Sequence, residues 1–179
     1  MISILFDLQL KYSRSQDPPA LFKDCQNRIR SMALVHESLY YTETLASINF
    51  RKYLEKLVNR LISSFGSSVQ NIRITVTGAE IYLNINQAVP AGLVANELIV
   101  NCLKHAFPEQ RAGEIHISLE EENGRRLIEI KDNGVGLGQE FSLEKPRSFG
   151  WLMISNLMKQ LGGAVTVTGE NGTTCRLAF

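Results

Sequence analysis

The spacing of apolar positions divides the chain into an all-helical part followed by a mixed part. Residues 2–12 and 20–44 repeat apolar side chains at helical intervals, and the turn between them (13–19) offers Asp17 as an N-cap with Pro18 in the first helical turn. The longer helix carries one apolar stripe with a period of about 3.5 residues, formed by Leu21, Cys25, Ile29, Met32, His36 and Leu39. Two helices alone are too thin to bury such a stripe, so the pattern predicts a helical hairpin that pairs with a second copy in a four-helix bundle.

From residue 48 onward, helical and strand patterns alternate. Helical spacing predicts helices over 50–65, 89–106 and 150–161. Alternating apolar positions predict strands over 72–77, 81–85, 114–120, 126–131, 164–168 and 173–179. Asn123-Gly124 and Asn171-Gly172 lie between neighbouring strand patterns, which is typical of hairpin turns. The order predicts an α+β domain (48–179) with helices on one face of a mixed sheet, preceded by the helical hairpin (1–47).

Composition and charge exclude several classes of protein. Hydrophobic residues make up 44% of the chain, which is enough for a packed core. The net charge is +1 without a basic run, so we expect no nucleic-acid binding. The apolar stretches are far shorter than a membrane span and no leader opens the chain, so we expect no membrane contact.

The cysteines indicate the redox compartment of the protein, and the first residues indicate that the chain belongs to a longer protein. Cys25, Cys102 and Cys175 are odd in number and widely spaced, which favours reduced thiols in a cytoplasmic protein over disulfides or a zinc site. The chain begins inside an amphipathic helical pattern with no capping residue ahead of it. We therefore expect it to be a segment of a longer protein.

The predicted helix over 89–106 carries a polar face. Glu97, Asn101 and His105 follow at i, i+4 and i+8, with Lys104 alongside. A carboxylate, an amide, an amine and an imidazole in one line suit a hydrated Mg²⁺ ion with a triphosphate. A solvated polar face accounts for the same pattern, and His105 also fits a simple charge at a helix C-terminus.

Three further patches contain glycines or hydroxyls beside predicted strand or helix ends. Asp132 ends a strand and begins Asp-Asn-Gly-Val-Gly-Leu-Gly, where a carboxylate can accept a hydrogen bond from an exocyclic amine such as that of adenine. Gly150 begins a helix, whose first N–H groups can bind an anion. Thr173 and Thr174 enter the last strand, and their hydroxyls can reach a base edge through water. A capped glycine loop remains the alternative for the first patch.

The order of these four patches resembles the GHKL superfamily, which includes histidine kinases, type II topoisomerases, heat-shock chaperones and mismatch-repair ATPases. The resemblance covers about residues 75–179 and implies the Bergerat fold, a two-layer sandwich of a mixed sheet and helices. It also implies ATP and Mg²⁺ as cofactors.

By this resemblance, particular residues take particular roles. Asn101 corresponds to the Mg²⁺-binding asparagine, and Asp132 to the aspartate that binds the adenine amino group. Gly134, Gly136 and Gly150 correspond to the glycines that flank the nucleotide and its lid.

The N-terminal third narrows the resemblance to one group of sensor histidine kinases. Residues 28–40 resemble the second dimerisation helix of the HWE-like or HisKA-type-2 subgroup, and residues 96–108 resemble its nucleotide helix. This implies a homodimer through the N-terminal helices and a response regulator receiver domain as partner. The acceptor histidine of the subgroup would precede Met1. His36 is followed by Glu37, which imitates an acceptor histidine with an adjacent acidic base, but the place of His36 in the apolar stripe favours packing.

The sequence departs from the pattern of this subgroup at two places. Trp151 stands where the subgroup has a small aliphatic residue, and the lid (138–147) is short.

We expect Glu97, Asn101 and Lys104 to contribute to catalysis by positioning and charge neutralisation. Glu97 would hold the metal's water shell or the acceptor imidazole, or activate water as in the ATPases. The alternatives to a histidine kinase are a non-catalytic nucleotide-binding dimerisation scaffold and an anti-sigma-type Ser/Thr kinase.

Overall fold

The computed structural model describes most of the predicted C-terminal domain. The described residues are 47–138, 142, 148–169 and 171–179, together with Gln26, Ile29 and Ala33. Those three residues are helical, as the predicted long helix requires, and Ile29 is 40% exposed. The predictions for the remainder of the hairpin, including Asp17, His36 and Cys25, and for most of the lid lie outside the described residues.

A five-stranded mixed sheet forms one layer of the domain, in the order β2-β4-β5-β7-β6. Its strands are β2 (Ile72–Gly78), β4 (Gly113–Glu122), β5 (Arg125–Asp132), β6 (Ala164–Thr168) and β7 (Thr174–Ala178). β2 and β4 run parallel, whereas the other neighbours are antiparallel. The predicted mixed sheet is therefore confirmed, and the Asn123-Gly124 turn joins β4 to β5 with positive φ at both residues.

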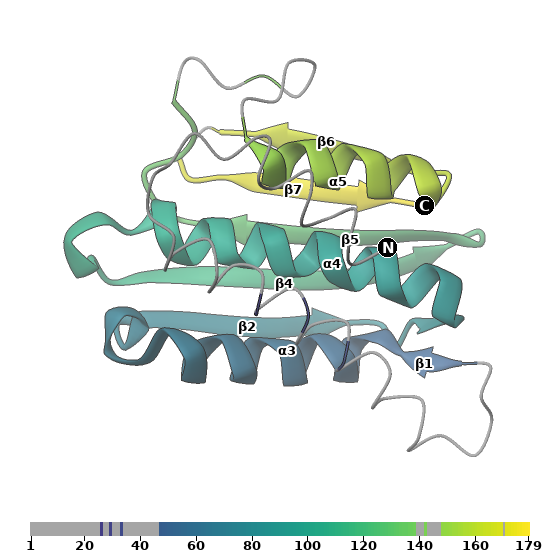
Figure 1. The fold of residues 1–179 in the computed structure, drawn as a ribbon, viewed down its shortest axis with the longest axis horizontal. Helices are drawn as coiled ribbons and strands as arrows, with labels where there is room; N and C mark the ends of the chain where they lie inside the picture. The colour runs from purple at the N-terminus through teal and green to yellow at the C-terminus, as the bar shows by residue number, and fades with distance from the viewer. Residues whose placement is uncertain are drawn as a thin grey trace.

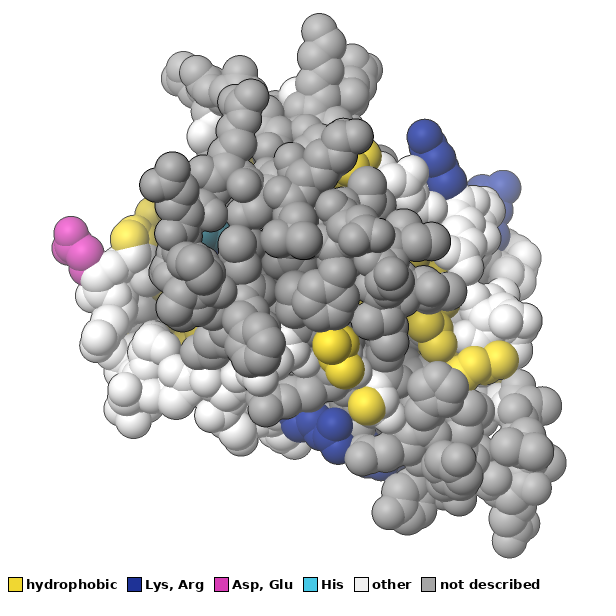
Figure 2. Space-filling view, in the orientation of Figure 1, with side chains coloured by type: hydrophobic (Ala, Val, Ile, Leu, Met, Phe, Trp, Pro, Cys, Tyr) yellow, Lys and Arg dark blue, Asp and Glu magenta, His cyan; other side chains and the backbone are white. Residues whose placement is uncertain are grey.

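Helices α3 (Phe50–Phe65), α4 (Ile85–Asn101) and α5 (Phe149–Gln160) form the second layer on one face of the sheet (Figure 1). α4 lies between α3 and α5, and its residues 90–100 are all buried. The core fills the space between the layers, where each fully buried aliphatic or aromatic side chain contributes about 1.5–3 kcal/mol. None of the described helices combines the length and apolar character that crossing a bilayer requires. In Figure 2, which shows this helical face, the described basic side chains stand in separate groups at the rim.

The predicted strand over 81–85 is wrong in length. Only Tyr82–Leu83 forms a strand (β3), and it pairs antiparallel with β1 (Ile48–Asn49) in a separate two-stranded sheet. The side chain of Asn84 accepts a hydrogen bond from the backbone N–H of Gln87 at 3.1 Å. This N-cap starts α4 at Ile85, four residues earlier than the apolar spacing predicts.

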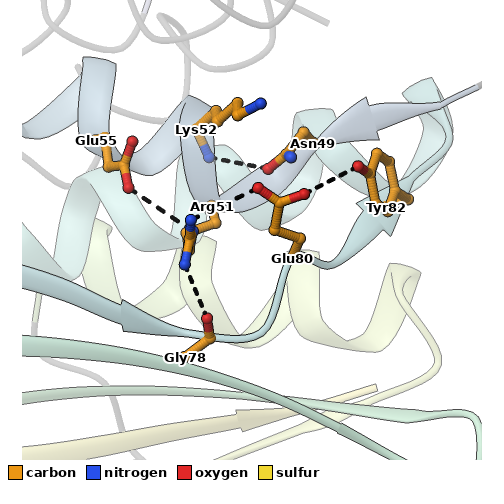
Figure 3. Close-up of polar contacts among 7 residues, drawn as sticks. All are labelled: Asn49, Arg51, Lys52, Glu55, Gly78, Glu80 and Tyr82. Atoms are coloured by element: carbon orange, nitrogen blue, oxygen red, sulfur yellow. Dashed lines mark hydrogen bonds and ion pairs between the residues drawn. The ribbon is translucent and has the colours of Figure 1, made fainter.

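A polar network ties β1 and the start of α3 to the segment before β3 (Figure 3). Arg51 donates to the backbone carbonyl of Gly78 at 3.1 Å and forms ion pairs with Glu55 and Glu80 at 3.8 and 3.5 Å. The hydroxyl of Tyr82 donates to the other oxygen of Glu80 at 3.1 Å. The first turn of α3 is thereby fixed to the edge of the domain.

The predicted α-helix over 89–106 ends as a different kind of helix. α-Helical geometry ends at Asn101, and Cys102–Ala106 form a π-helical segment (η2). A π segment has i→i+5 hydrogen bonds and a wider turn, and such segments are frequent at functional sites. The side chains after Asn101 therefore point in other directions than a continuous α-helix would give them.

Candidate nucleotide-binding site

A cavity of about 260 Å³ opens where the end of α4 and η2 meet the loop after β5, the start of α5 and the start of β7. Four segments that are far apart in the sequence, with α4 and η2 forming one of them, thus contribute to one site. The lining residues are Leu98, Asn101, Cys102, His105, Ala106, Asp132, Gly136, Leu137, Gly138, Ser148, Trp151, Thr173 and Cys175.

Asp132 is the only carboxylate among these lining residues, and it is 2% exposed. Its Oδ1 accepts hydrogen bonds from the backbone N–H groups of Gly134 and Thr173, at 2.9 and 3.1 Å. Its Oδ2 accepts a hydrogen bond from the thiol of Cys102, with 3.4 Å between sulfur and oxygen. Donors from three elements therefore fix the orientation of one buried carboxylate beside the cavity.

Close backbone packing holds Asp132 in place. The backbone N–H of Asp132 donates to the carbonyl of Thr173 at 2.9 Å. The backbone at position 172 lies close to the backbone of Asp132, and this requires glycine. The φ of Gly172 is +103°, and a Cβ there would overlap the backbone carbonyl of Asp132. A Cβ at Gly134 would likewise overlap the carbonyl of Ala106 at the end of η2. The loop after β5 and the π segment are therefore in direct backbone contact.

Two buried thiols flank Asp132. Burial, the charge of Asp132 and the hydrogen bond to it raise the pKa of Cys102 well above the usual thiol value. Burial, followed by the charge of Asp132, raises the pKa of Cys175 to about 12. Both thiols remain protonated at neutral pH, so the carboxylate has neutral neighbours.

The polar helix face is only partly directed into the cavity. Asn101 and His105 line it, whereas Glu97 and Lys104 are not among the lining residues. Glu97 is 6% exposed, and its Oε1 accepts from the side-chain amide of Asn96 at 3.5 Å. Its Oε2 lies 3.1 Å from the place that a Cβ on Gly150 would occupy. The predicted common face thus holds for Asn101 and His105, while Glu97 lies under the start of α5.

Some of the predicted glycines and threonines line the cavity, and others do not. Gly136 and Thr173 line the cavity, and Gly134 contributes through its N–H bond to Asp132. Gly150 is the second residue of α5, and its neighbours Ser148 and Trp151 line the cavity in its place. Thr174 pairs with Lys131 in the β5–β7 ladder and lies outside the lining.

The sequence interpretation did not include Cys102 and Cys175 among the site residues. A signal for both was present in the pattern. Cys175 alternates with Thr174 along the last strand and so takes the opposite, inward face. Cys102 follows Asn101 directly on the inward stripe of its helix. The inward faces of these two elements meet at Asp132.

The donor set fits a nucleotide with a divalent cation that the phosphates help to hold. Within the described part of the chain, no group of three or more His, Cys, Asp and Glu side chains is arranged to hold a metal ion. Mg²⁺ bound to phosphates needs only one or two protein oxygens, and the side-chain amide of Asn101, which lines the cavity, would supply one. Asp132 offers a buried acceptor for an amine.

Comparisons with known proteins agree with this geometry. The family described as "Histidine kinase-like ATPase domain" matches residues 60–179, and the family described as "Histidine kinase" (HisKA_2) matches residues 1–65. The sensor histidine kinase PdtaS of Mycobacterium tuberculosis is 27% identical over 96% of the chain and 35% of its own length. Blue-light-activated histidine kinase 2 of Erythrobacter litoralis is 20% identical, over 93% and 49%.

The fold is also found among solved structures. The histidine kinase domain of the blue-light-activated kinase EL346 of Erythrobacter litoralis superposes with a TM-score of 0.79 at 18% identity. The superposition covers 100% of this chain and 82% of that one. The predicted two-layer fold is thereby confirmed. The chain itself spans 35% of the length of PdtaS.

Proposed function

Because the chain belongs to the histidine kinase-like ATPase domain family, we propose that its cavity binds Mg²⁺-ATP and presents the γ-phosphoryl group to a histidine. One observation carries the proposal. The buried carboxylate of Asp132 is held by backbone N–H groups beside a cavity that Asn101 and His105 also line. The hydrogen-bond acceptor for the base (Asp132) and the side chains for the phosphates and the cation (Asn101 and His105) would thus share one site.

Asp132 would accept a hydrogen bond from the exocyclic amine of adenine. Its neighbours Cys102 and Cys175 are neutral, so the local charge favours a donor on the ligand edge. A carbonyl at the same place, as in guanine, would meet the carboxylate with like partial charge. A hydrogen bond to a charged group contributes roughly 1.5–3 kcal/mol, which is enough to select one base over the other.

Asn101, His105 and Lys104 would serve the phosphate end. The amide oxygen of Asn101 would be a ligand of Mg²⁺, and the ion supplies charge neutralisation to the transferring phosphoryl group. His105 lines the cavity and Lys104 precedes it on η2, so both would offset phosphate charge. Glu97 lies behind this face, beside α5, and would act by holding bound water or the acceptor imidazole.

Residues 1–65 support the histidine kinase over the other candidates. An anti-sigma-type Ser/Thr kinase has no need of the helical hairpin, and these residues match the "Histidine kinase" family. Membership of that family indicates dimerisation through the N-terminal helices. We further propose that a response regulator receiver domain takes the phosphoryl group from the acceptor histidine, in the cytoplasm. The position of the acceptor ahead of Met1 remains a prediction.

Calorimetric titration of the chain with Mg²⁺-ADP tests the nucleotide site. Asp132→Ala is expected to abolish measurable binding while leaving the circular dichroism spectrum unchanged. Lys131→Ala is the matched control, because Lys131 is the preceding residue of β5 and is exposed on the opposite face of the sheet. Unchanged binding by Asp132→Ala would show that the proposed pocket is wrong.

A further inference from the structure

The two oxygens of Asp132 are held by donors of unequal strength. Oδ1 accepts from two backbone N–H groups, those of Gly134 and Thr173, at 2.9 and 3.1 Å. Oδ2 accepts from the thiol of Cys102 at 3.4 Å. A thiol is a weak donor, whereas a peptide N–H is a strong one. Oδ1 is therefore fully engaged, and Oδ2 is held only lightly.

Cys102 is placed to act on the carboxylate and on the cavity at once. It is 8% exposed, belongs to the π segment, and lines the cavity together with Asp132. Its raised pKa, caused mainly by burial, keeps the thiol in the donating form at neutral pH. A second charge beside Asp132 is thus avoided, and Oδ2 of the carboxylate retains one donor.

We propose that Cys102 is a positioning residue for adenine recognition: its thiol holds the side chain of Asp132 so that Oδ2 accepts the exocyclic amine of the base. A carboxylate oxygen can accept two hydrogen bonds, as Oδ1 does here, so the single bond from Cys102 leaves Oδ2 with acceptor capacity for an amine. This inference rests on the proposed function, and it makes a side chain of η2 a determinant of the choice between 6-amino and 6-oxo purines.

Cys175 provides a matched control within the same cavity. It is also a buried thiol that lines the cavity, and it feels the charge of Asp132. The thiol hydrogen bond to Asp132 comes from Cys102. Removal of either thiol changes the volume of the wall by a similar amount. Only the Cys102 change removes a donor from the carboxylate.

The experiment measures binding of ADP and of inosine diphosphate, which has a carbonyl in place of the exocyclic amine. Calorimetry is performed on the full 179-residue chain and its variants. Cys102→Ala is expected to weaken ADP binding roughly three- to tenfold and inosine diphosphate binding by less than about twofold. Cys102→Ser keeps a donor and should retain the preference for ADP. Cys175→Ala should leave the ratio of the two affinities as it is in the parent chain.

A loss that is equal for both ligands, or no loss at all, would overturn the proposal, because a general effect on cavity shape does not depend on the exocyclic amine. Cys102→Val, which lacks a donor but fills the buried space, repeats the test if the alanine variant does not fold. Asp132→Ala distinguishes a failure of the proposed nucleotide site from a failure of the proposed role of Cys102. If it loses ADP while the Cys102 variants keep the parent ratio, the nucleotide site stands and the role of Cys102 does not.

Discussion

The backbone N–H of Val135 donates to the carbonyl of Ala106 at 3.0 Å. Ala106 ends the π segment that follows Asn101, and Val135 lies in the glycine loop that follows Asp132. This one bond joins η2 to the loop after β5, which in the proposed function are the phosphate end and the base end of the site. The loop can approach so closely because residue 134 has no side chain.

Gly134→Ala should therefore damage the site through the backbone. The added Cβ would overlap the carbonyl of Ala106, so the loop must move away from η2. We expect a loss of about 1–3 kcal/mol in the free energy of unfolding, typical of overpacking, and ADP affinity reduced by about tenfold or more. Denaturant unfolding and calorimetry measure the two effects. Gly138→Ala is the control for stability, because a Cβ there meets no atom of the described residues within 4 Å.

Asn101→Ala should separate the cation from the base. Asn101 lines the cavity at the end of α4, and its side chain is not one of the three donors that fix Asp132. We expect Mg²⁺ to improve ATP affinity in the parent chain by roughly tenfold or more, and this gain to vanish in the variant. ATP titrations with Mg²⁺ and with a chelator give both values. A variant that retains the full gain would remove Asn101 from the cation site.

The fold was largely predictable because its elements have strong local signals. The apolar period of 50–65 matches α3 (Phe50–Phe65), and the Asn123-Gly124 turn lies between the ends of β4 and β5. Both features depend on neighbouring residues alone. The short strand β3 was predicted too long, because alternation at 81–85 gave no sign that Asn84 caps the next helix.

The site was less predictable because its shape depends on contacts between distant segments. The change from α to π geometry after Asn101 leaves no periodic trace, and the hydrogen bond from Val135 that accompanies it comes from a loop far along the chain. The hydrogen bond from Cys102 to Asp132 joins residues 30 positions apart. Such a pair becomes visible only when the inward faces of helix and strand are placed together.

Trp151 should report nucleotide binding directly. It is the single tryptophan of the chain, it is half-buried, and it lines the cavity in the first turn of α5. A nucleotide in the cavity would change the solvent exposure of the indole, so titration with ADP should produce a saturable change in its emission. The same titration of Asp132→Ala should give no saturable change. A parent chain that binds ADP by calorimetry without an emission change would place the ligand away from Trp151.

The network around Arg51 should make stability depend on pH through Glu80 (Figure 3). The hydrogen bond from Tyr82, followed by the nearby side-chain amide of Asn49, lowers the pKa of Glu80 below its ordinary value of 4.5, with smaller contributions from the charges of Lys52 and Arg51. A carboxyl whose pKa is lower in the folded state stabilises the fold above its unfolded pKa. That contribution is lost as the pH falls through the folded value.

Thermal unfolding of the parent chain and of Glu80→Gln from neutral pH to below pH 4.5 tests this prediction. The parent should be the more stable at neutral pH, and the difference should shrink as the pH falls below the ordinary carboxyl value because the parent then becomes protonated as well. Glu55→Gln is the control, since Glu55 also pairs with Arg51 but at 3.8 Å along one helix face. Its effect should be smaller, as expected for an exposed i,i+4 pair. Equal midpoints for the parent and Glu80→Gln at every pH would mean that the network in Figure 3 does not hold β1 and α3 to the domain.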